Sequence, residues 1–215
     1  MGKKGLTIKE AVAQSHQYRI RMFKSDFLEK FSYVHPLVPF YIFIPVILFC
    51  SFASFYFYSI PVLKFAYLAV LGLFFWTIIE YTLHRFLFHP PMTNEFLKKV
   101  YFYTHGIHHE AMNDASRLVM PPAVSIPVST GIYFAARALM GADALPFFVG
   151  FITGYTIYDF LHFASHFFAF DNKIFKIIKK KHMVHHHKDH HSNYGFTSPL
   201  WDYVFGTVYK KKPSE

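Results

Sequence analysis

The sequence has a single cysteine, Cys50, and only 13 acidic residues among 215. One cysteine cannot form a disulfide within the chain, so nothing in the sequence indicates an oxidising compartment. The acidic residues are outnumbered by 22 Lys and Arg, which gives a formal net charge of +9. No short apolar run follows the basic N-terminus, so we expect no cleavable signal peptide.

Charge is almost absent from four long stretches of the chain. These apolar segments cover residues 37–58, 62–83, 123–140 and 145–161. Each is close to the roughly 20 residues with which a helix crosses a bilayer. A basic nucleic-acid-binding protein would not carry such segments. We therefore expect an all-α integral membrane protein with four transmembrane helices.

The links between consecutive apolar segments are very short. Residues 59–61 join the first pair and residues 141–144 join the second, so each pair forms a tight hairpin with its turn on the same side of the membrane. Only two of the 22 basic residues, Lys64 and Arg137, belong to that side. The positive-inside rule then places both termini and the other basic residues in the cytoplasm, at a bacterial inner membrane or an ER membrane.

Two parts of the chain are expected outside the membrane. In residues 1–35 apolar side chains recur at roughly helical spacing, which predicts an amphipathic helix that lies on the membrane surface or packs on the protein's own cytosolic face. Residues 36–215 form one domain, in which residues 84–122 and 162–215 build a cytoplasmic cap. Three consecutive lysines, residues 179–181, are either a membrane anchor or a docking point for an acidic redox partner.

Histidine is concentrated in the predicted cap. Of 15 histidines, 13 fall in four clusters, which read HRFLFH from His84, HGIHH from His105, HFASH from His162 and HMVHHHKDHH from His182. The topology rests on charge and hydropathy alone, yet it places all four clusters on the same face of the membrane. This agreement indicates one shared site rather than four unrelated surface patches.

The spacings within the clusters suit metal binding. His105, His108 and His109 stand at i, i+3 and i+4, on one face of a helix, and the last cluster repeats this pattern. The ten matched positions are His84, His89, His105, His108, His109, His162, His166, His182, His185 and His186. Ten imidazoles are too many for one metal ion and reasonable for two, with five nitrogens each and room for an oxygen-derived ligand.

The pair His84 and His89 departs from this pattern, because positions i and i+5 do not share a face of an ideal helix. Pro90 disfavours the helical conformation of the residue before it, so we expect His89 just past the helix end and turned back toward the site. The sequence also has no Glu-x-x-His motif, which separates it from the carboxylate-bridged di-metal bundles.

Six segments of the sequence resemble the membrane fatty acid hydroxylase superfamily, which includes sterol desaturases. They read EYTLHRFLFH, HGIHH, RLVMPP, GYTIYDFLHFASH, HMVHHHKDHH and FTSPLWDYVFGT, and together they span about residues 80 to 207. HRFLFH running into Pro90, and RLVMPP, favour the fatty acid 2-hydroxylase branch.

This resemblance implies O2-dependent hydroxylation of a long acyl chain next to its carbonyl, with O2 as co-substrate. It implies a non-haem centre of two iron ions, with zinc an alternative in purified protein, and it makes the ten matched histidines the ligands. His187, where relatives often carry an aromatic residue, and His190 and His191, which fall outside the matched spacing, are then outer or surface residues. Because residues 1–35 are too few for the cytochrome b5 domain of many relatives, we expect a separate electron donor, either a ferredoxin or a cytochrome b5 with its reductase.

Two acidic residues beside the clusters are candidates for supporting roles. Glu80 lies one turn before His84, and Asp159 lies three residues before His162. Each carboxylate could accept the second ring N–H of its histidine and fix the orientation of the ring. Asp159 could instead line the substrate entrance with Tyr158, and both acids could be interfacial charges without a specific partner.

Two other functions stay open. A sterol or carotenoid oxidase, or a desaturase, of the same superfamily would use similar metal chemistry and differ in the channel that guides the substrate. A membrane metal-transport or metal-binding protein could use the histidines as a chelating surface. A transporter places polar residues at the membrane midplane, whereas the middles of the four segments are almost wholly apolar.

Overall fold

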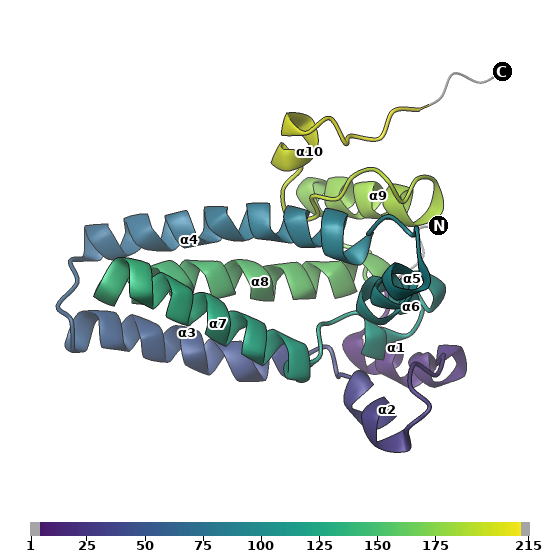
Figure 1. Ribbon diagram of the computed structural model, residues 1–215, viewed down its shortest axis with the longest axis horizontal. Coiled ribbons are helices and arrows are strands. Elements are labelled where there is room, and N and C mark those ends of the chain that lie inside the picture. The colour runs from purple at the N-terminus through teal and green to yellow at the C-terminus, as the bar shows by residue number, and fades with distance from the viewer. Residues whose placement is uncertain (1–4, 212–215) are drawn as a thin grey trace.

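The computed structural model describes residues 5–211, and every regular element in that range is helical. Four long helices form a bundle, and the shorter helices gather at one end of it (Figure 1). The long helices are α3 (Val38–Tyr56), α4 (Val62–Thr82), α7 (Pro122–Met140) and α8 (Ala144–Phe167). The shorter ones are α1 (Ile8–Ser15), α2 (Asp26–Ser32), α5 (Glu95–Tyr101), α6 (Ile107–Glu110), α9 (Lys173–His187) and α10 (Leu200–Val204).

Both predicted hairpins are present, and they turn at the same end of the bundle. Lys64 at the start of α4 forms an ion pair of 2.7 Å with Asp143, which lies in the turn between α7 and α8. That turn begins at Gly141, whose φ of 58° lies in the left-handed region that favours glycine. The two turns face away from the short helices (Figure 1).

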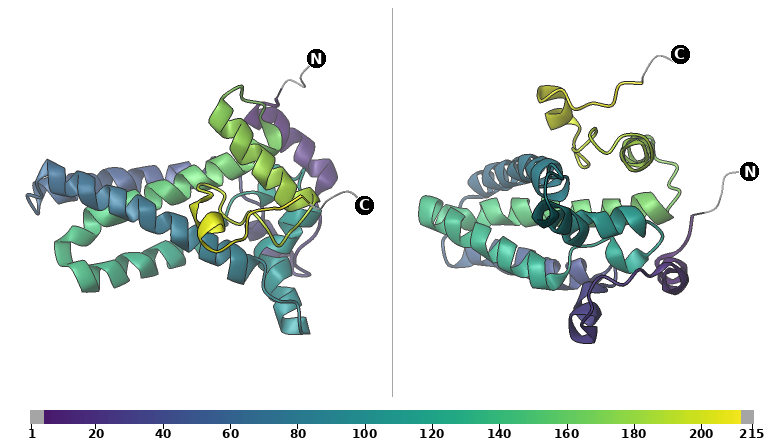
Figure 2. Two further views of the ribbon diagram at one scale, coloured as in Figure 1. Left: turned by 90° about the horizontal axis from the view of Figure 1, so that it is seen from above. Right: turned by 45° about the vertical axis from the view of Figure 1, so that its right-hand side comes forward.

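Three largely helical stretches in residues 5–211 are long and apolar enough to cross a membrane: Val38–Tyr56, Val62–Phe88 and Ala115–Phe167. The third stretch contains both α7 and α8, which fold back on each other (Figure 2). Large apolar side chains on the outside of the bundle are widely exposed, with Leu63 at 83% and Leu139 at 86%. Exposed apolar surface of this extent is typical of a face that meets lipid.

Helix α8 is the central helix of the bundle, and most of its side chains are buried. It approaches α4 so closely that two glycines are required. A Cβ on Gly150 would lie 1.7 Å from the carbonyl oxygen of Ala69, and one on Gly72 would lie 1.9 Å from that of Phe147. Small residues allow such close backbone contact in membrane bundles. The contact fixes α4 against α8, and both helices lead to histidines at the capped end.

The N-terminal segment differs from the single helix predicted for residues 1–35, of which residues 1–4 lie outside the described part of the chain. It forms two helices, α1 and α2, because Thr7 and Ser25 each accept a hydrogen bond from a backbone N–H three residues further on. Such caps start a new helix at each position. Helix α1 packs on the protein itself, where the Ser15 hydroxyl accepts a 2.7 Å hydrogen bond from the backbone N–H of Ala115.

Helix α2 is tied to the cap by a buried ion pair. Glu29 and Arg117 approach to 2.8 Å, and the Tyr33 hydroxyl donates a 2.6 Å hydrogen bond to the same carboxylate. Burial raises the pKa of Glu29, but the hydrogen bonds from Tyr33 and from two backbone N–H groups, together with the Arg117 charge, outweigh it. The pKa of Glu29 is therefore lowered from its ordinary value of 4.5. On the other side of α2, Phe27 and Phe31 are exposed.

Candidate metal centre

All ten predicted histidines gather at the capped end of the bundle, nine of them in two groups and the tenth between these groups. In the five-histidine group, ligand atoms lie within 4.8 Å of one another in His108, His162, His166, His182 and His186. The four-histidine group, defined in the same way, consists of His84, His89, His105 and His185. The tenth residue, His109, lies between the groups, with its ring 4.2 Å from that of His186 and 5.0 Å from that of His89.

The spacing within α9 explains how one helix serves both groups. His182 and His186 are one turn apart on the same face, and both belong to the five-histidine group. His185 lies on the neighbouring face and belongs to the four-histidine group. On α8, His162 and His166 are again one turn apart and join the five-histidine group.

A π-helical segment brings His84 and His89 together. Helix α4 continues into this segment, Leu83–Phe88, and the backbone N–H of His89 donates a 3.1 Å hydrogen bond to the carbonyl of His84. An i→i+5 bond of this kind widens the helical turn, so residues five apart lie on one face. His89 lies at the end of the helix, directly before Pro90, as predicted. Its ring reaches the site because of the wider π-helical turn, whereas the sequence predicts that the chain turns back at His89.

Backbone carbonyls fix the tautomers of three of the histidines. The Nδ1 atom of His84 lies 2.7 Å from the carbonyl oxygen of Tyr194, and that of His185 lies 2.8 Å from the carbonyl oxygen of Ser192. In the five-histidine group, Nδ1 of His162 lies 2.8 Å from the carbonyl oxygen of Leu118. A carbonyl oxygen only accepts, so Nδ1 carries the proton in each ring and the lone pair is at Nε2.

The Nε2 atoms of neighbouring rings converge. His108 Nε2 lies 2.9 Å from His186 Nε2 and 3.0 Å from His162 Nε2. In the four-histidine group, the Nε2 atoms of His185 and His89 are 3.0 Å apart. Because His162 and His185 have their lone pairs at Nε2, each group directs lone pairs into a shared space.

Several buried ring nitrogens have no hydrogen-bond partner in the described part of the chain. They are Nε2 of His84, Nε2 of His105, Nδ1 of His108, both nitrogens of His109 and Nδ1 of His186. Unpaired nitrogens in a buried site are costly unless another group satisfies them. Converging, unpaired imidazole nitrogens are the donor set that suits iron, zinc or copper. The ten histidines therefore fit a pair of transition-metal ions.

The protonation of the cluster favours metal binding as well. Burial, reinforced by neighbouring histidines, lowers the pKa of His89 to about 2 and that of His109 to about 2. Burial also lowers the pKa of His185 to about 4, although the bond to the Ser192 carbonyl opposes this shift. The pKa values of His105, His108 and His182 are lowered in the same direction, mainly by burial. These rings are uncharged at neutral pH, which is the form that binds a metal.

Glu80 supports the site differently from the prediction. It accepts no hydrogen bond from the His84 ring, because Nδ1 of His84 is bonded to the Tyr194 carbonyl and Nε2 has no hydrogen-bond partner in the described residues. The carboxylate instead accepts hydrogen bonds from the backbone N–H groups of Phe196 and Thr197, at 2.6 and 3.0 Å, and one from the Thr197 hydroxyl. Sequence reasoning missed this role because the partners lie more than a hundred positions away.

Asp202 holds the same loop from its other side. Its carboxylate accepts hydrogen bonds of 2.9 Å from the backbone N–H groups of Tyr194 and Gly195 and one of 2.7 Å from the Thr207 hydroxyl. Asp202 was missed although it lies in the recognised segment FTSPLWDYVFGT, because the segment alone gives no partner for it. The Phe196 ring of the loop packs against the His182 ring at 4.9 Å.

Asp159 does not accept from His162, whose Nδ1 is bonded to the Leu118 carbonyl. It lines a cavity together with Tyr158, and the alternative that these two residues line the substrate entrance stays a prediction. Asp159 is buried, and its Oδ2 atom has no hydrogen-bond partner in the described residues. A polar group in the cavity could therefore bind to this oxygen.

The cavity has a volume of about 350 Å³ and mainly apolar walls. This size is typical of sites for small molecules. His105, His108 and His162 line one part of it, so both histidine groups reach it, while Leu28 and Phe31 of α2 line another part. An apolar chain bound in the cavity would lie directly beside the metal centre.

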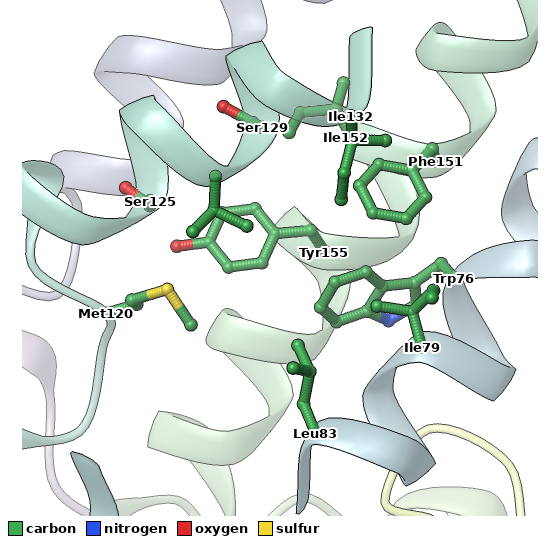
Figure 3. A pocket seen from close by; sticks show the side chains of 11 residues that line it. Trp76, Ile79, Leu83, Met120, Ser125, Ser129, Ile132, Phe151, Ile152 and Tyr155 are labelled. Atoms are coloured by element: carbon green, nitrogen blue, oxygen red, sulfur yellow. The ribbon is translucent and has the colours of Figure 1, made fainter. Parts of the chain in front are cut away.

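A smaller cavity of about 30 Å³ lies inside the bundle, between α4, α7 and α8 (Figure 3). Trp76, Ser129 and Tyr155 are among its walls. Both cavities are lined by Leu83, Met120 and Val128. The two cavities therefore lie next to each other, the larger one beside the histidines and the smaller one in the apolar interior of the bundle.

Known proteins resemble this chain in sequence over nearly its whole length. The sequence model of a family described as fatty acid hydroxylase matches residues 69–207, which include all ten histidines. The human fatty acid 2-hydroxylase is 35% identical over 99% of this chain, and the alignment spans 63% of the human protein, just under two thirds. A dihydroceramide fatty acyl 2-hydroxylase of Arabidopsis thaliana is 35% identical over 87% of this chain and 79% of its own length.

The fold is also known. A solved structure of scs7p, in which only the hydroxylase domain is visible, superimposes with a TM-score of 0.80 at 31% sequence identity. The match covers 97% of this chain and 81% of the solved one. The helical bundle and its cap are therefore an arrangement shared with that hydroxylase domain.

Proposed function

The chain belongs to the fatty acid hydroxylase family, and on that premise we propose that it hydroxylates a long acyl chain at the carbon next to the carbonyl, with O2 as co-substrate. The acyl chain is that of a fatty acid or of a lipid that carries one. The names of the relatives support this substrate class, since one acts on fatty acids and another on the fatty acyl group of dihydroceramide.

The observation that carries the proposal is that both histidine groups line one apolar cavity. His105 comes from the four-histidine group, and His108 and His162 come from the five-histidine group. A chain held in the cavity would meet both metal ions at once. A metal-storage or metal-transport protein has no need of an apolar cavity beside its ligands.

Two iron ions would be held by the ten histidines. One would be bound by His108, His162, His166, His182 and His186, and the other by His84, His89, His105, His109 and His185. When bound, the iron supplies the oxidising chemistry that an unactivated C–H bond requires and that protein side chains lack.

The protein's own residues position the substrate. The apolar cavity binds the acyl chain and excludes water from the carbon to be oxidised. The free Oδ2 of Asp159, with Tyr158 beside it, would bind the polar end of the substrate and so set which carbon lies next to the histidines. The smaller cavity in the bundle would receive the far end of the chain.

The four long helices would cross the bilayer, with the metal centre and both chain ends on the cytoplasmic side. The distribution of basic residues supports this orientation. The exposed lysines of the cap would then face the cytosol, where a separate electron donor, a ferredoxin or a cytochrome b5 with its reductase, can reach them.

Lipid mass spectrometry of cells with and without the gene tests the proposal. We expect 2-hydroxylated acyl lipids only in cells that carry it, and no such lipids with the His108→Ala or the His185→Ala variant. An oxidised sterol, an oxidised carotenoid or a desaturated acyl chain in place of the hydroxy acid would contradict 2-hydroxylation and indicate another reaction of the superfamily.

A further inference from the structure

A third group of histidines reaches the protein surface at the edge of the metal centre. Ligand atoms of His109, His185 and His190 lie within 4.8 Å of one another. His185 also belongs to the four-histidine group, and His109 lies between that group and the five-histidine group. His190 is the exposed member of the three, whereas His185 is completely buried.

The rings are arranged as a short series from solvent to interior. The His190 ring lies 4.7 Å from the His109 ring and 6.0 Å from the His185 ring. It also stacks on the His89 ring, with centroids 6.4 Å apart and planes at 12°. Both nitrogens of His109 are buried without a hydrogen-bond partner in the described residues, so they are available to an incoming ion.

The loop after α9 keeps His190 in this place. The Asp189 carboxylate accepts a 3.0 Å hydrogen bond from the backbone N–H of His191, and the Asp189 carbonyl accepts one of 3.3 Å from the N–H of Ser192. The neighbouring side chains of His187 and His191 are also exposed, but neither belongs to a group of converging ligands. His190 therefore differs from His187 and His191 in that its side chain lies beside His109 and His185.

We propose that His109, His185 and His190 form an uptake site, through which a divalent metal ion passes between solvent and the buried centre. This inference rests on the proposed metal centre and adds a residue to it. A hydrated ion loses water at a large cost unless ligands replace the water. His190 would replace the first water molecules at the surface, His109 and His185 the next, and the ion would then move to the ligands of the four-histidine group.

Exchange of bound zinc tests the uptake site without any need for substrate. The full chain, purified in detergent with natural zinc bound, is mixed with an excess of isotopically enriched zinc, and the isotope ratio in the protein is followed by mass spectrometry. We expect exchange to be about tenfold slower in His190→Ala, with the same total zinc per chain, since outer residues of metal sites have effects of this order. His187→Ala and His191→Ala are the matched controls and should exchange at the wild-type rate.

A ligand-competent replacement separates metal binding from a structural role. His190→Cys should restore exchange toward the wild-type rate, because a thiolate also binds zinc, whereas His190→Gln should remain slow. Wild-type exchange in His190→Ala would overturn the proposal, and so would a lower total zinc content, which would make His190 a permanent ligand. The zinc-exchange results test the role of His190 only. Hydroxylation is tested separately with the wild-type chain.

Discussion

The carboxylate of Glu80 in α4 accepts a 2.6 Å hydrogen bond from the backbone N–H of Phe196, 116 residues further along the chain. With Asp202, it fixes the loop whose carbonyl groups receive the Nδ1–H of His84 and His185. Glu80 thus orients two rings of the four-histidine group through the backbone, without a hydrogen bond to either ring. The support of a metal ligand by a backbone carbonyl sets both its tautomer and its direction.

Glu80→Ala should release one metal ion from the purified protein. The substitution removes the acceptor of the buried Phe196 N–H, at about 1–3 kcal/mol, and that of the partly buried Thr197 N–H. The loop that holds His84 and His185 is then fixed by Asp202 alone. We expect metal analysis to find about one ion per chain, retained by the five-histidine group, instead of two. Glu80→Gln is the control, because its amide oxygen still accepts from both N–H groups and should keep two ions bound. Two ions in Glu80→Ala would show that the loop does not need this carboxylate.

Gly150→Ala should separate α4 from α8 and weaken the fold. The added Cβ would lie 1.7 Å from the carbonyl oxygen of Ala69, which is backbone and cannot move aside alone. We expect a loss of about 1–3 kcal/mol in the free energy of unfolding, measured in detergent, together with loss of metal. Gly131→Ala, in α7, meets nothing within 4 Å and should be neutral or stabilising. Equal stabilities of the two variants would argue against the close helix contact.

Acid should weaken the attachment of α2 to the cap. The pKa of Glu29 is lowered by folding, so its contribution to stability is present above the ordinary value of 4.5 and is lost as the pH falls through the folded pKa. We expect the unfolding midpoint of the wild-type protein to drop more steeply below about pH 4.5 than that of Glu29→Gln, which has no carboxylate to protonate. Glu29→Gln should also be less stable at neutral pH, because the buried Arg117 then loses the closer of its two carboxylate partners, Glu29 at 2.8 Å, and keeps only Asp114 at 3.9 Å. Parallel pH profiles of the two proteins would exclude this role for Glu29.

Ser129→Phe should shorten the acyl chains that are hydroxylated. Ser129 is buried and lines the small cavity within the bundle, so a phenyl ring there would fill the space proposed for the end of the chain. We expect mass spectrometry of the products to show a shift to shorter chains at unchanged metal content. Thr130→Phe is the matched control, since the next residue of α7 is exposed and its side chain lines neither cavity. An unchanged distribution in Ser129→Phe would place the tail elsewhere.

Much of the fold and the set of histidines could be predicted from the sequence, because each depends on local patterns. Uncharged segments with short links predict helical hairpins, and i, i+4 spacing predicts rings on one face. The pairing of His84 with His89 depended on a π-helical turn, which an ideal helical period does not predict. The role of Glu80 depended on a contact across 116 residues, and the break between α1 and α2 depended on the cap at Ser25.

His190 gives a further case. The sequence predicts that His190 is an outer residue, because it falls outside the matched histidine spacing. Helical periodicity gives no information about the direction of a side chain in a loop. In the structure, the turn after α9 places the His190 side chain beside His109 and His185. Only the folded loop shows which of the three additional histidines in this stretch lies beside the centre.

The most direct test of the proposed function is the incorporation of labelled oxygen into the product. Membranes that contain the protein are supplied with an electron donor, a long acyl substrate and ¹⁸O2, and the product is analysed by mass spectrometry with fragmentation. We expect a 2-hydroxy acyl product that carries one ¹⁸O atom, formed by the wild-type protein and not by His108→Ala. A hydroxyl at another carbon, a hydroxyl without the label, or equal product from His108→Ala would contradict O2-dependent 2-hydroxylation at the histidine centre.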